Sequence, residues 1–326
     1  MSEITNKKVK FKTFRFNRDS DYLPYYREYE MEVAQDDVML DILNKIKWEF
    51  DGSFSYRRSC RHGICGSCGI KVNDKPVLAC KERVFDLIDI FGEELVIDPQ
   101  SKQRAAKDLI IDKKDFWDKY NAVTPYLVAD IDENPTTENL VSPEEYEMID
   151  EADICVQCGS CYYACPAVEV NEEYFGPAAL ALAMRFSKDV RDGATTERLK
   201  NVNQLGKGIW DCVKCYECFE ACPKGVNPIG KITTLHQQTF QEGVHENNVA
   251  TRHAVGFKNS IVKHGFLDET GLVMYSDGLF KTATHHAPTG LRMMMAGKVV
   301  MPWALPKSTK LAEIKKLVKI SSTVKF

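Results

Sequence analysis

The sequence of 326 residues predicts an α+β protein in which a small sheet domain is followed by an all-helical domain and a C-terminal extension. Three observations predict this class. Side chains near the N-terminus alternate between charged and apolar, as they do in half-buried strands. Two copies of the run CxxCxxCxxxCP lie further along, among segments that favour helices, and no cysteine follows them. A chain of this length usually forms two or three units, and we place them at 1–112, 113–242 and 243–326.

The first unit shows the pattern of a sheet that grips one helix. Residues 8–17 and 26–33 alternate in polarity across a short polar gap, so we expect a hairpin. Apolar side chains then recur at helical spacing, at Val38, Leu40, Leu43, Ile46 and Phe50. This helix is expected to end near Gly52, and residues 75–80 and 95–98 are further strand candidates. Together these elements predict a β-grasp domain.

The second unit is predicted to be helical. Residues 129–146 are acidic and rich in Pro, Thr and Asn, which is typical of a surface connection. Beyond it, residues 177–185 and 229–241 favour helices on either side of the second cysteine run. The two runs repeat one pattern 57 residues apart, which implies a pseudo-twofold placement of whatever they bind.

The extension from residue 243 carries five of the seven histidines and the run Met293-Met294-Met295, which is more typical of adaptable core or interface than of a metal site. Near its end Leu311, Ile314, Leu317 and Val318 form an apolar stripe. Lysines surround the stripe, at Lys298, Lys307, Lys310, Lys315, Lys316, Lys319 and Lys325. A helix of this kind can lie on an anionic membrane surface, dock on a partner or pack on its own domain. The sequence pattern does not distinguish these three alternatives.

Composition excludes several classes of protein. With 43 basic and 47 acidic residues the formal charge is −4, which gives no reason to expect a nucleic-acid partner. The N-terminal segment lacks the apolar core of a secretory signal, and no apolar run approaches the ~18 residues that a membrane span needs. We therefore expect a soluble or peripheral protein.

All twelve cysteines fall into three sets. The sets are Cys60, Cys65, Cys68 and Cys80; Cys155, Cys158, Cys161 and Cys165; and Cys212, Cys215, Cys218 and Cys222. Disulfides are typical of shorter secreted chains, and structural zinc is typical of paired CxxC motifs without a fourth Cys-Pro. Thiolates at the spacings found here are instead typical of iron–sulfur clusters, so we expect three redox centres.

The first set has the plant-type spacing for a [2Fe–2S] cluster. Glycines recur through its loop, at Gly63, Gly66 and Gly69, where they allow positive φ and bring backbone N–H groups close to the sulfurs. Arginines lie beside the set, at Arg57, Arg58 and Arg61. They are interpreted either as solvated surface charge or as residues that tune the cluster or dock a partner.

In each of the other two sets, the fourth cysteine is expected to bind the cluster that the other run holds. In two-cluster ferredoxins the first three cysteines of a run hold one cluster and the fourth holds the other. One [4Fe–4S] cluster is then expected on Cys155, Cys158, Cys161 and Cys222. The third cluster is expected on Cys165, Cys212, Cys215 and Cys218. Pro166 and Pro223 end the runs and turn the chain away.

Motifs for other chemistry are missing. The sequence has no GxGxxG, no Walker loop and no nucleophile elbow, and all its cysteines are assigned to clusters. We therefore predict no catalytic residue in this chain and expect it to conduct electrons.

The segments SCRHGICGSC, VLAC, CVQCGSCYYACP, FGPAALALAMRF and CFEACPKGVNP resemble the iron–sulfur subunits of succinate dehydrogenase and fumarate reductase. The resemblance covers about residues 8–240, including KDLIIDKKDFWDKY at 107–120. It implies electron relay between a FAD flavoprotein, where succinate and fumarate interconvert, and a membrane anchor that handles quinone. It also implies that the [2Fe–2S] domain faces the flavoprotein and that the third cluster faces the membrane.

Three departures from the usual subunit point to a variant. The usual third cluster is a [3Fe–4S] with no cysteine where Cys215 stands, so a [4Fe–4S] is favoured here. Residues 167–174 lack the usual paired tryptophans and Val213 replaces a frequent histidine, which puts the usual quinone pocket in doubt. The extension from 243 is similar to the small subunit of heterodisulfide reductase and to thiol-dependent fumarate reductases. This combination resembles enzymes whose anchor is cysteine-rich and heterodisulfide-reductase-like.

Alternatives remain at the level of the sequence. The same relay could serve a thiol-dependent fumarate reductase, and a free multi-cluster ferredoxin is the alternative without a complex. The direction of transfer is open because cluster potentials span a wide range. We expect a peripheral position on the cytoplasmic face of the membrane, with co-export alongside a signal-bearing partner as the alternative.

Overall fold

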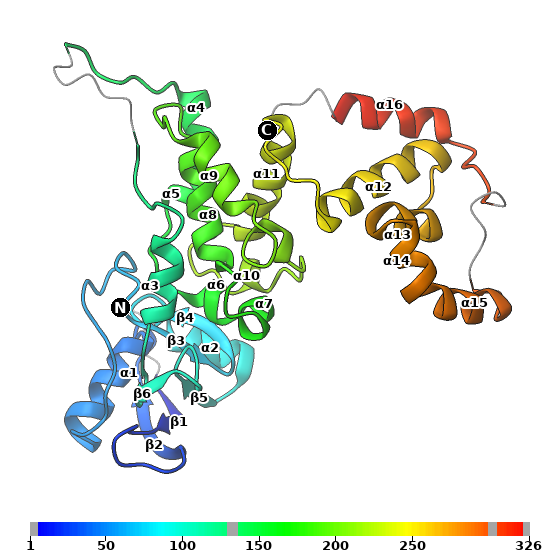
Figure 1. Cartoon of the computed structure of the whole chain (residues 1–326). Coiled ribbons are helices and arrows are strands. Elements are labelled where there is room, and N and C mark those ends of the chain that lie inside the picture. Colours follow the sequence, from blue (N-terminus) through cyan, green and yellow to red (C-terminus); the bar gives the residue numbers. More distant parts are fainter. Residues whose placement is uncertain (1–5, 129–135, 299–304, 322–326) are drawn as a thin grey trace. The chain divides into compact units, whose positions relative to one another are not determined.

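The computed structural model describes residues 6–128, 136–298 and 305–321, and the chain divides into two compact units (Figure 1). Unit 1 is Met1–His236 and unit 2 is Gln237–Phe326. Unit 1 holds all twelve cysteines, so every candidate ligand lies in one compact body.

Unit 1 begins with a five-stranded mixed sheet in the order β2-β1-β5-β3-β4. Its strands are β1 (Lys7–Arg15), β2 (Tyr25–Val33), β3 (Gly69–Val72), β4 (Lys75–Leu78) and β5 (Glu94–Asp98). The predicted hairpin is confirmed, because β1 and β2 pair antiparallel with Phe11 opposite Tyr29. The short strand β3 was not singled out from the sequence, although it directly follows Cys68 and so carries the cysteine loop into the sheet.

One helix packs against this sheet and continues into a wide final turn. It comprises α1 (Met39–Lys45) and the π-helical turn η1 (Ile46–Phe50), and it ends before Gly52 as predicted. Its buried side chains Met39, Ile42 and Leu43 share one core with Phe11 and Leu95 of the sheet. The remaining elements here are α2 (Val84–Phe91), β6 (Ala105–Lys107) and β7 (Ile110–Ile111).

Beyond β7 the described part of unit 1 contains helices and no further strand. The helices are α3 (Lys114–Asn121), α4 (Pro143–Glu147), α5 (Asp150–Asp153), α6 (Ser160–Tyr163), α7 (Pro166–Val170), α8 (Gly176–Ser187), α9 (Thr195–Val202), η2 (Ile209–Asp211), α10 (Glu217–Glu220) and α11 (Pro228–Gln241). Both predicted helices are confirmed as α8 and α11. Of the predicted connection at 129–146, residues 129–135 lie outside the described residues and α4 occupies its last part.

Unit 2 is built from helices with few buried side chains. They are α12 (Val249–His264), α13 (Glu269–Asp277), α14 (Leu279–Lys281), η3 (Thr282–His286), α15 (Ala287–Met295) and α16 (Leu311–Ser321). The predicted amphipathic helix is confirmed as α16, and it packs on α12, where Ile314 approaches Gly265. The Met run lies on α15, which buries no side chain. Within the described ranges, no helix is both long enough and apolar enough to cross a membrane.

Candidate iron–sulfur sites

The loop between η1 and β3 wraps backbone N–H groups around the sulfur of Cys60. The N–H groups of His62, Ile64 and Cys65 each lie 3.4 Å from Cys60 Sγ. These donors, His62 first, lower the pKa of the Cys60 thiol to about 6. The loop is therefore shaped to hold a thiolate, which is the form that binds iron.

Two further cysteines of this set adjoin strands, while Cys65 lies exposed in the loop. Cys68 precedes β3 and Cys80 follows β4, and both are buried. The N–H of Gly63 donates to Cys80 Sγ at 3.2 Å, which its φ of +69° makes accessible. Burial raises the pKa of the Cys68 thiol to about 12, so this thiol ionises at neutral pH only when a cation replaces its proton.

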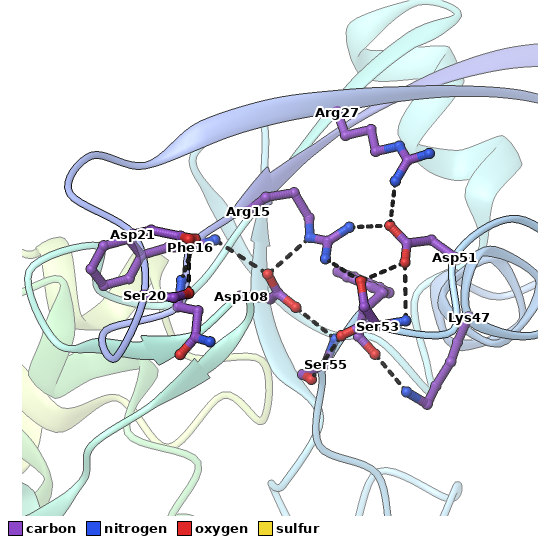
Figure 2. A network of polar contacts seen from close by, with 12 residues as sticks. Arg15, Phe16, Ser20, Asp21, Arg27, Lys47, Asp51, Ser53, Ser55 and Asp108 are labelled. Atoms are coloured by element: carbon purple, nitrogen blue, oxygen red, sulfur yellow. Dashed lines mark hydrogen bonds and ion pairs between the residues drawn. The ribbon is translucent and has the colours of Figure 1, made fainter.

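A buried ionic network fixes the start of the loop (Figure 2). Arg15 of β1 is 5% exposed and donates from Nε to Asp108 Oδ1 at 2.9 Å and from Nη1 to Asp51. The other oxygen of Asp108 accepts the N–H of Ser55 at 2.8 Å. Burial works against the charge of Asp51, but hydrogen bonds from Ser53 and Arg15 hold its pKa well below the usual range. Residues 51–55 are thereby held between β1 and residue 108, five residues ahead of Cys60.

The structure brings Cys155, Cys158 and Cys161 together with Cys222, from the other run, around one cavity. The rest of its lining is mostly apolar and includes Val156, Ala178, Ala181, Pro223, Val226 and Pro228. Burial raises the pKa of the Cys155 thiol to about 11 and that of Cys161 well above its ordinary value. Among the described residues no group of three or more ligands is placed to hold a single metal ion, so the four thiols around this apolar pocket fit a larger group such as an iron–sulfur cluster.

A second cavity gathers Cys165, Cys212, Cys215 and Cys218. Tyr174 lines the same cavity as Cys212 and is 1% exposed. Burial raises the pKa of the Cys218 thiol to about 12. Because four thiols surround this volume too, the donor set fits a four-iron cluster as well as a three-iron one.

The predicted internal repeat is visible in the backbone. Gln157 and Gly159 of the first run have φ of +54° and +87°, and the residues 57 positions later, Lys214 and Tyr216, have +54° and +68°. Helices α6 and α10 follow at equivalent positions. The same local geometry therefore presents three cysteines in each run, and the fourth crosses to the other cavity.

The three sites touch in sequence along unit 1. A Cβ on Gly66 of the first loop would lie 2.5 Å from the carbonyl oxygen of Val156 and 2.9 Å from Cα of Cys158. Gln100 bridges the two parts through a 2.9 Å hydrogen bond to Ser160 Oγ. At the far side, the two cavities are lined by cysteines of the same two runs. The arrangement is a continuous row of thiol sites.

Two residues that border the cavities were missed from the sequence. Lys113 Nζ donates to the carbonyl oxygen of Cys158 at 2.6 Å, and Tyr174 contacts Cys212. Neither lies in a cysteine motif, so spacing gave no signal for them. The arginines predicted as surface charge or docking residues, Arg57, Arg58 and Arg61, are all exposed, and Arg58 lies over the ring of Trp48.

Family models match both parts of unit 1. Residues 10–118 match a 2Fe-2S iron–sulfur cluster binding domain, and residues 151–226 match a 4Fe-4S dicluster domain. These matches support the coarse class, a sheet domain of [2Fe–2S] type followed by a helical [4Fe–4S] region. One solved chain, from the Mycobacterium smegmatis Sdh1 complex in the apo form, has the same fold, with a TM-score of 0.64 at 22% identity, and the match covers 73% of this chain and 98% of that chain.

Curated relatives agree in their names. The chain is 34% identical over 232 residues to the fumarate reductase iron–sulfur subunit of Escherichia coli, covering 71% of this chain and 92% of the relative. It is 36% identical over 230 residues to that of Haemophilus influenzae, covering 67% and 88%. It is 34% identical over 235 residues to the succinate dehydrogenase iron–sulfur subunit of Coxiella burnetii, covering 71% and 97%. Since the cysteine sites, the fold and these relatives coincide, the chain belongs to the family of iron–sulfur subunits of fumarate reductase and succinate dehydrogenase.

Proposed function

We propose that this chain carries electrons through three iron–sulfur clusters, between a FAD-containing flavoprotein subunit and a membrane-associated anchor subunit that uses quinone. The observation that carries the proposal is the row of three thiol sites, in which Gly66 of the first abuts Cys158 of the second. Bound clusters would supply reversible one-electron storage at each site. The protein supplies close spacing, N–H donors and exclusion of water, and no residue of the chain is assigned to bond making on succinate or fumarate.

The ligand sets are part of the proposal. Cys60, Cys65, Cys68 and Cys80 hold a [2Fe–2S] cluster in a β-grasp domain within residues 1–112. Cys155, Cys158, Cys161 and Cys222 hold a [4Fe–4S] cluster in the helical domain within residues 113–242. Cys165, Cys212, Cys215 and Cys218 hold the third, for which [4Fe–4S] is favoured over [3Fe–4S] because Cys215 lines the cavity with the other three.

Exposed apolar side chains offer docking points at both ends of the row. Near the first site, Ile64 is 68% exposed and Trp48 is 64% exposed, and we assign this surface to the flavoprotein. Near the third site, Val213 and Tyr216 are 65% and 59% exposed, and we assign this surface to the anchor. Each exposed pair neighbours a thiol that solvent reaches, Cys65 and Cys215 respectively, so a partner cofactor can approach closely there.

We further propose that the anchor is of the cysteine-rich, heterodisulfide-reductase-like type, on the cytoplasmic face of the membrane. Three features of this chain support that choice: the thiol at Cys215, the lack of tryptophan at 167–174, and the extension from residue 243. A dithiol in place of quinol as electron source is the second candidate, favoured by the same extension.

The test is an anaerobic affinity purification of the chain from its native membranes, with mass spectrometry and electron paramagnetic resonance of the product. A flavoprotein, a cysteine-rich anchor and three cluster signals are expected. Fumarate reduction is then assayed with quinol and with dithiol donors in parallel. A transmembrane haem-bearing anchor would overturn the variant type, and recovery of the chain without any stoichiometric partner would overturn the relay in favour of a free carrier.

A further inference from the structure

One helical stretch in unit 2 buries no side chain in the described part of the chain, although it contacts α13. Residues 279–295 run through α14, η3 and α15 without a buried side chain. Phe280 is 82% exposed, Leu279 is 76% exposed and Met295 is 74% exposed. Most helices in proteins are stabilised by packing of an apolar face, and a stretch of this length is only marginally stable alone in water. The described residues of the chain therefore leave these apolar side chains open to solvent.

The apolar side chains share a side of α15. Leu291, Met294 and Met295 are spaced by three and four residues, which places them on one face, while Arg292 points elsewhere. Leu291 is 57% exposed, so this face is open to solvent. Leucine and phenylalanine on one face with lysine and arginine beside them are typical of helices that lie in a membrane interface.

The net positive charge of this part of the chain favours a negatively charged binding surface. Residues 278–326 contain nine lysines and arginines against one acidic residue, Glu313, a net charge of +8. Because the whole chain carries −4, residues 1–277 together carry −12. Asp277, the acidic side chain at the start of the stretch, is bound by His286 at 2.8 Å. Along 279–298 the exposed charges are Lys281, Arg292 and Lys298, all basic.

We propose that residues 279–298 lie on the surface of an anionic lipid bilayer, with Leu279, Phe280 and Leu291 among the acyl chains and the basic side chains at the phosphate headgroups. Apolar burial and attraction to anionic headgroups act together in such binding. This contact belongs to the chain itself and adds to any contact made through an anchor subunit. It does not depend on the proposed function, because lipid binding needs neither a flavoprotein nor an electron.

The test uses the full-length chain, purified anaerobically, in sedimentation with large vesicles. Vesicles that contain phosphatidylglycerol are compared with vesicles of phosphatidylcholine alone. We expect binding to the anionic vesicles, weaker binding to the neutral ones, and release as salt rises. The double variant Leu279→Ser/Phe280→Ser and the double variant Lys281→Glu/Arg292→Glu are each expected to bind about tenfold more weakly.

Matched controls come from unit 1. Leu140 is 81% exposed, close to the exposure of Phe280, and Lys200 is exposed on α9. Leu140→Ser and Lys200→Glu should bind vesicles as the unchanged chain does. No sedimentation of the unchanged chain, equal binding to neutral vesicles, or equal losses in the controls would each overturn the proposal. Protection of 279–298 from hydrogen exchange by a subunit of the purified complex, without vesicle binding, would assign the stretch to a protein partner instead.

Discussion

The ammonium group of Lys113 donates a hydrogen bond to the backbone carbonyl of Cys158, with 2.6 Å between Nζ and the oxygen. The same ammonium lies 5.7 Å from the centre of the Phe116 ring. Burial lowers the pKa of Lys113, since the charged form loses hydration. A cation is thus held beside the middle thiol site, where the first and second sites meet.

Replacing this cation is expected to lower the reduction potential of the middle cluster. The reduced cluster carries one more negative charge than the oxidised cluster. Lys113→Met removes a positive charge that stabilises the reduced cluster in a medium of low dielectric constant. The measurement is a redox titration followed by electron paramagnetic resonance. Lys114→Met is the matched control, because Lys114 is 78% exposed and pairs with Asp118 in solvent. An equal shift in both variants would contradict the assignment.

Tyr174→Phe is expected to lower the potential of the third cluster alone. The variant keeps the ring that lines the cavity and removes a hydroxyl that can donate a hydrogen bond to a ligand sulfur there. A hydrogen bond to a ligand sulfur stabilises the more negative reduced state. Tyr126→Phe, at a tyrosine 62% exposed, serves as control in the same titration. A shift of the middle cluster instead would show that the two cavities are assigned wrongly.

Cys215→Ser is expected to alter or remove the third cluster while the other two remain. Cys215 lines only the cavity that also holds Cys165, Cys212 and Cys218. The measurement is the resonance spectrum of the purified chain in oxidised and reduced states, together with its iron content. A spectrum unchanged in both states would remove Cys215 from the ligand set and favour a three-iron cluster.

Asp51→Asn is expected to destabilise unit 1 by about 3 kcal/mol at neutral pH, because it leaves Arg15 buried with one partner fewer. The side chains of Arg15 and Asp51 are 6% and 8% exposed. The paired side chains of Asp86 and Arg83 are 49% and 55% exposed. We therefore expect Asp86→Asn to lower the free energy of unfolding by less than about 1 kcal/mol. Thermal unfolding of the two variants compares them directly, and equal losses would contradict the role of the buried network.

The same carboxylate predicts a pH dependence. The pKa of Asp51 is lowered in the folded state, so its contribution to stability is complete above the unfolded pKa, about 3.9. That contribution is lost as the pH falls through the folded pKa. The difference in unfolding temperature between the unchanged chain and Asp51→Asn should therefore shrink below about pH 4. A constant difference down to lower pH would show that the charge of Asp51 is not what stabilises the loop.

Gly66→Ala is expected to weaken the junction of the first two sites. Its φ is +66° and an added Cβ would meet the backbone of Val156 at 2.5 Å. Gly243 allows the strain of a positive φ to be measured without a steric clash. Its φ is +65° and nothing lies within 4 Å of an added Cβ. We expect Gly243→Ala to cost about 1–2 kcal/mol from backbone strain alone, and Gly66→Ala to cost more and to reduce cluster content. Equal unfolding temperatures for the two variants would remove the close approach as a cause.

Local patterns made several elements predictable. The hairpin of β1 and β2 and the helix that begins at Met39 each bury a face that the spacing of apolar residues reveals, whereas α8 was predicted from its Ala- and Leu-rich composition and is buried on most sides. β3 and α2 were missed because short elements carry too few residues to show a period. The wide turn at 46–50 was also not predicted, since a π-helical turn has no distinct apolar spacing.

The sequence by itself determined which side chains act as ligands, the cysteines, and how many sites they form, because thiolate chemistry and cysteine spacing are properties of short segments. Only the tertiary structure decided what surrounds them. Lys113, Tyr174 and Gln100 reach the sites from other segments of the chain, and Gly66 meets Val156 where the sheet part of unit 1 adjoins its helical part. Such contacts depend on how separate elements pack, which no local pattern records. Which sites adjoin one another follows from that packing.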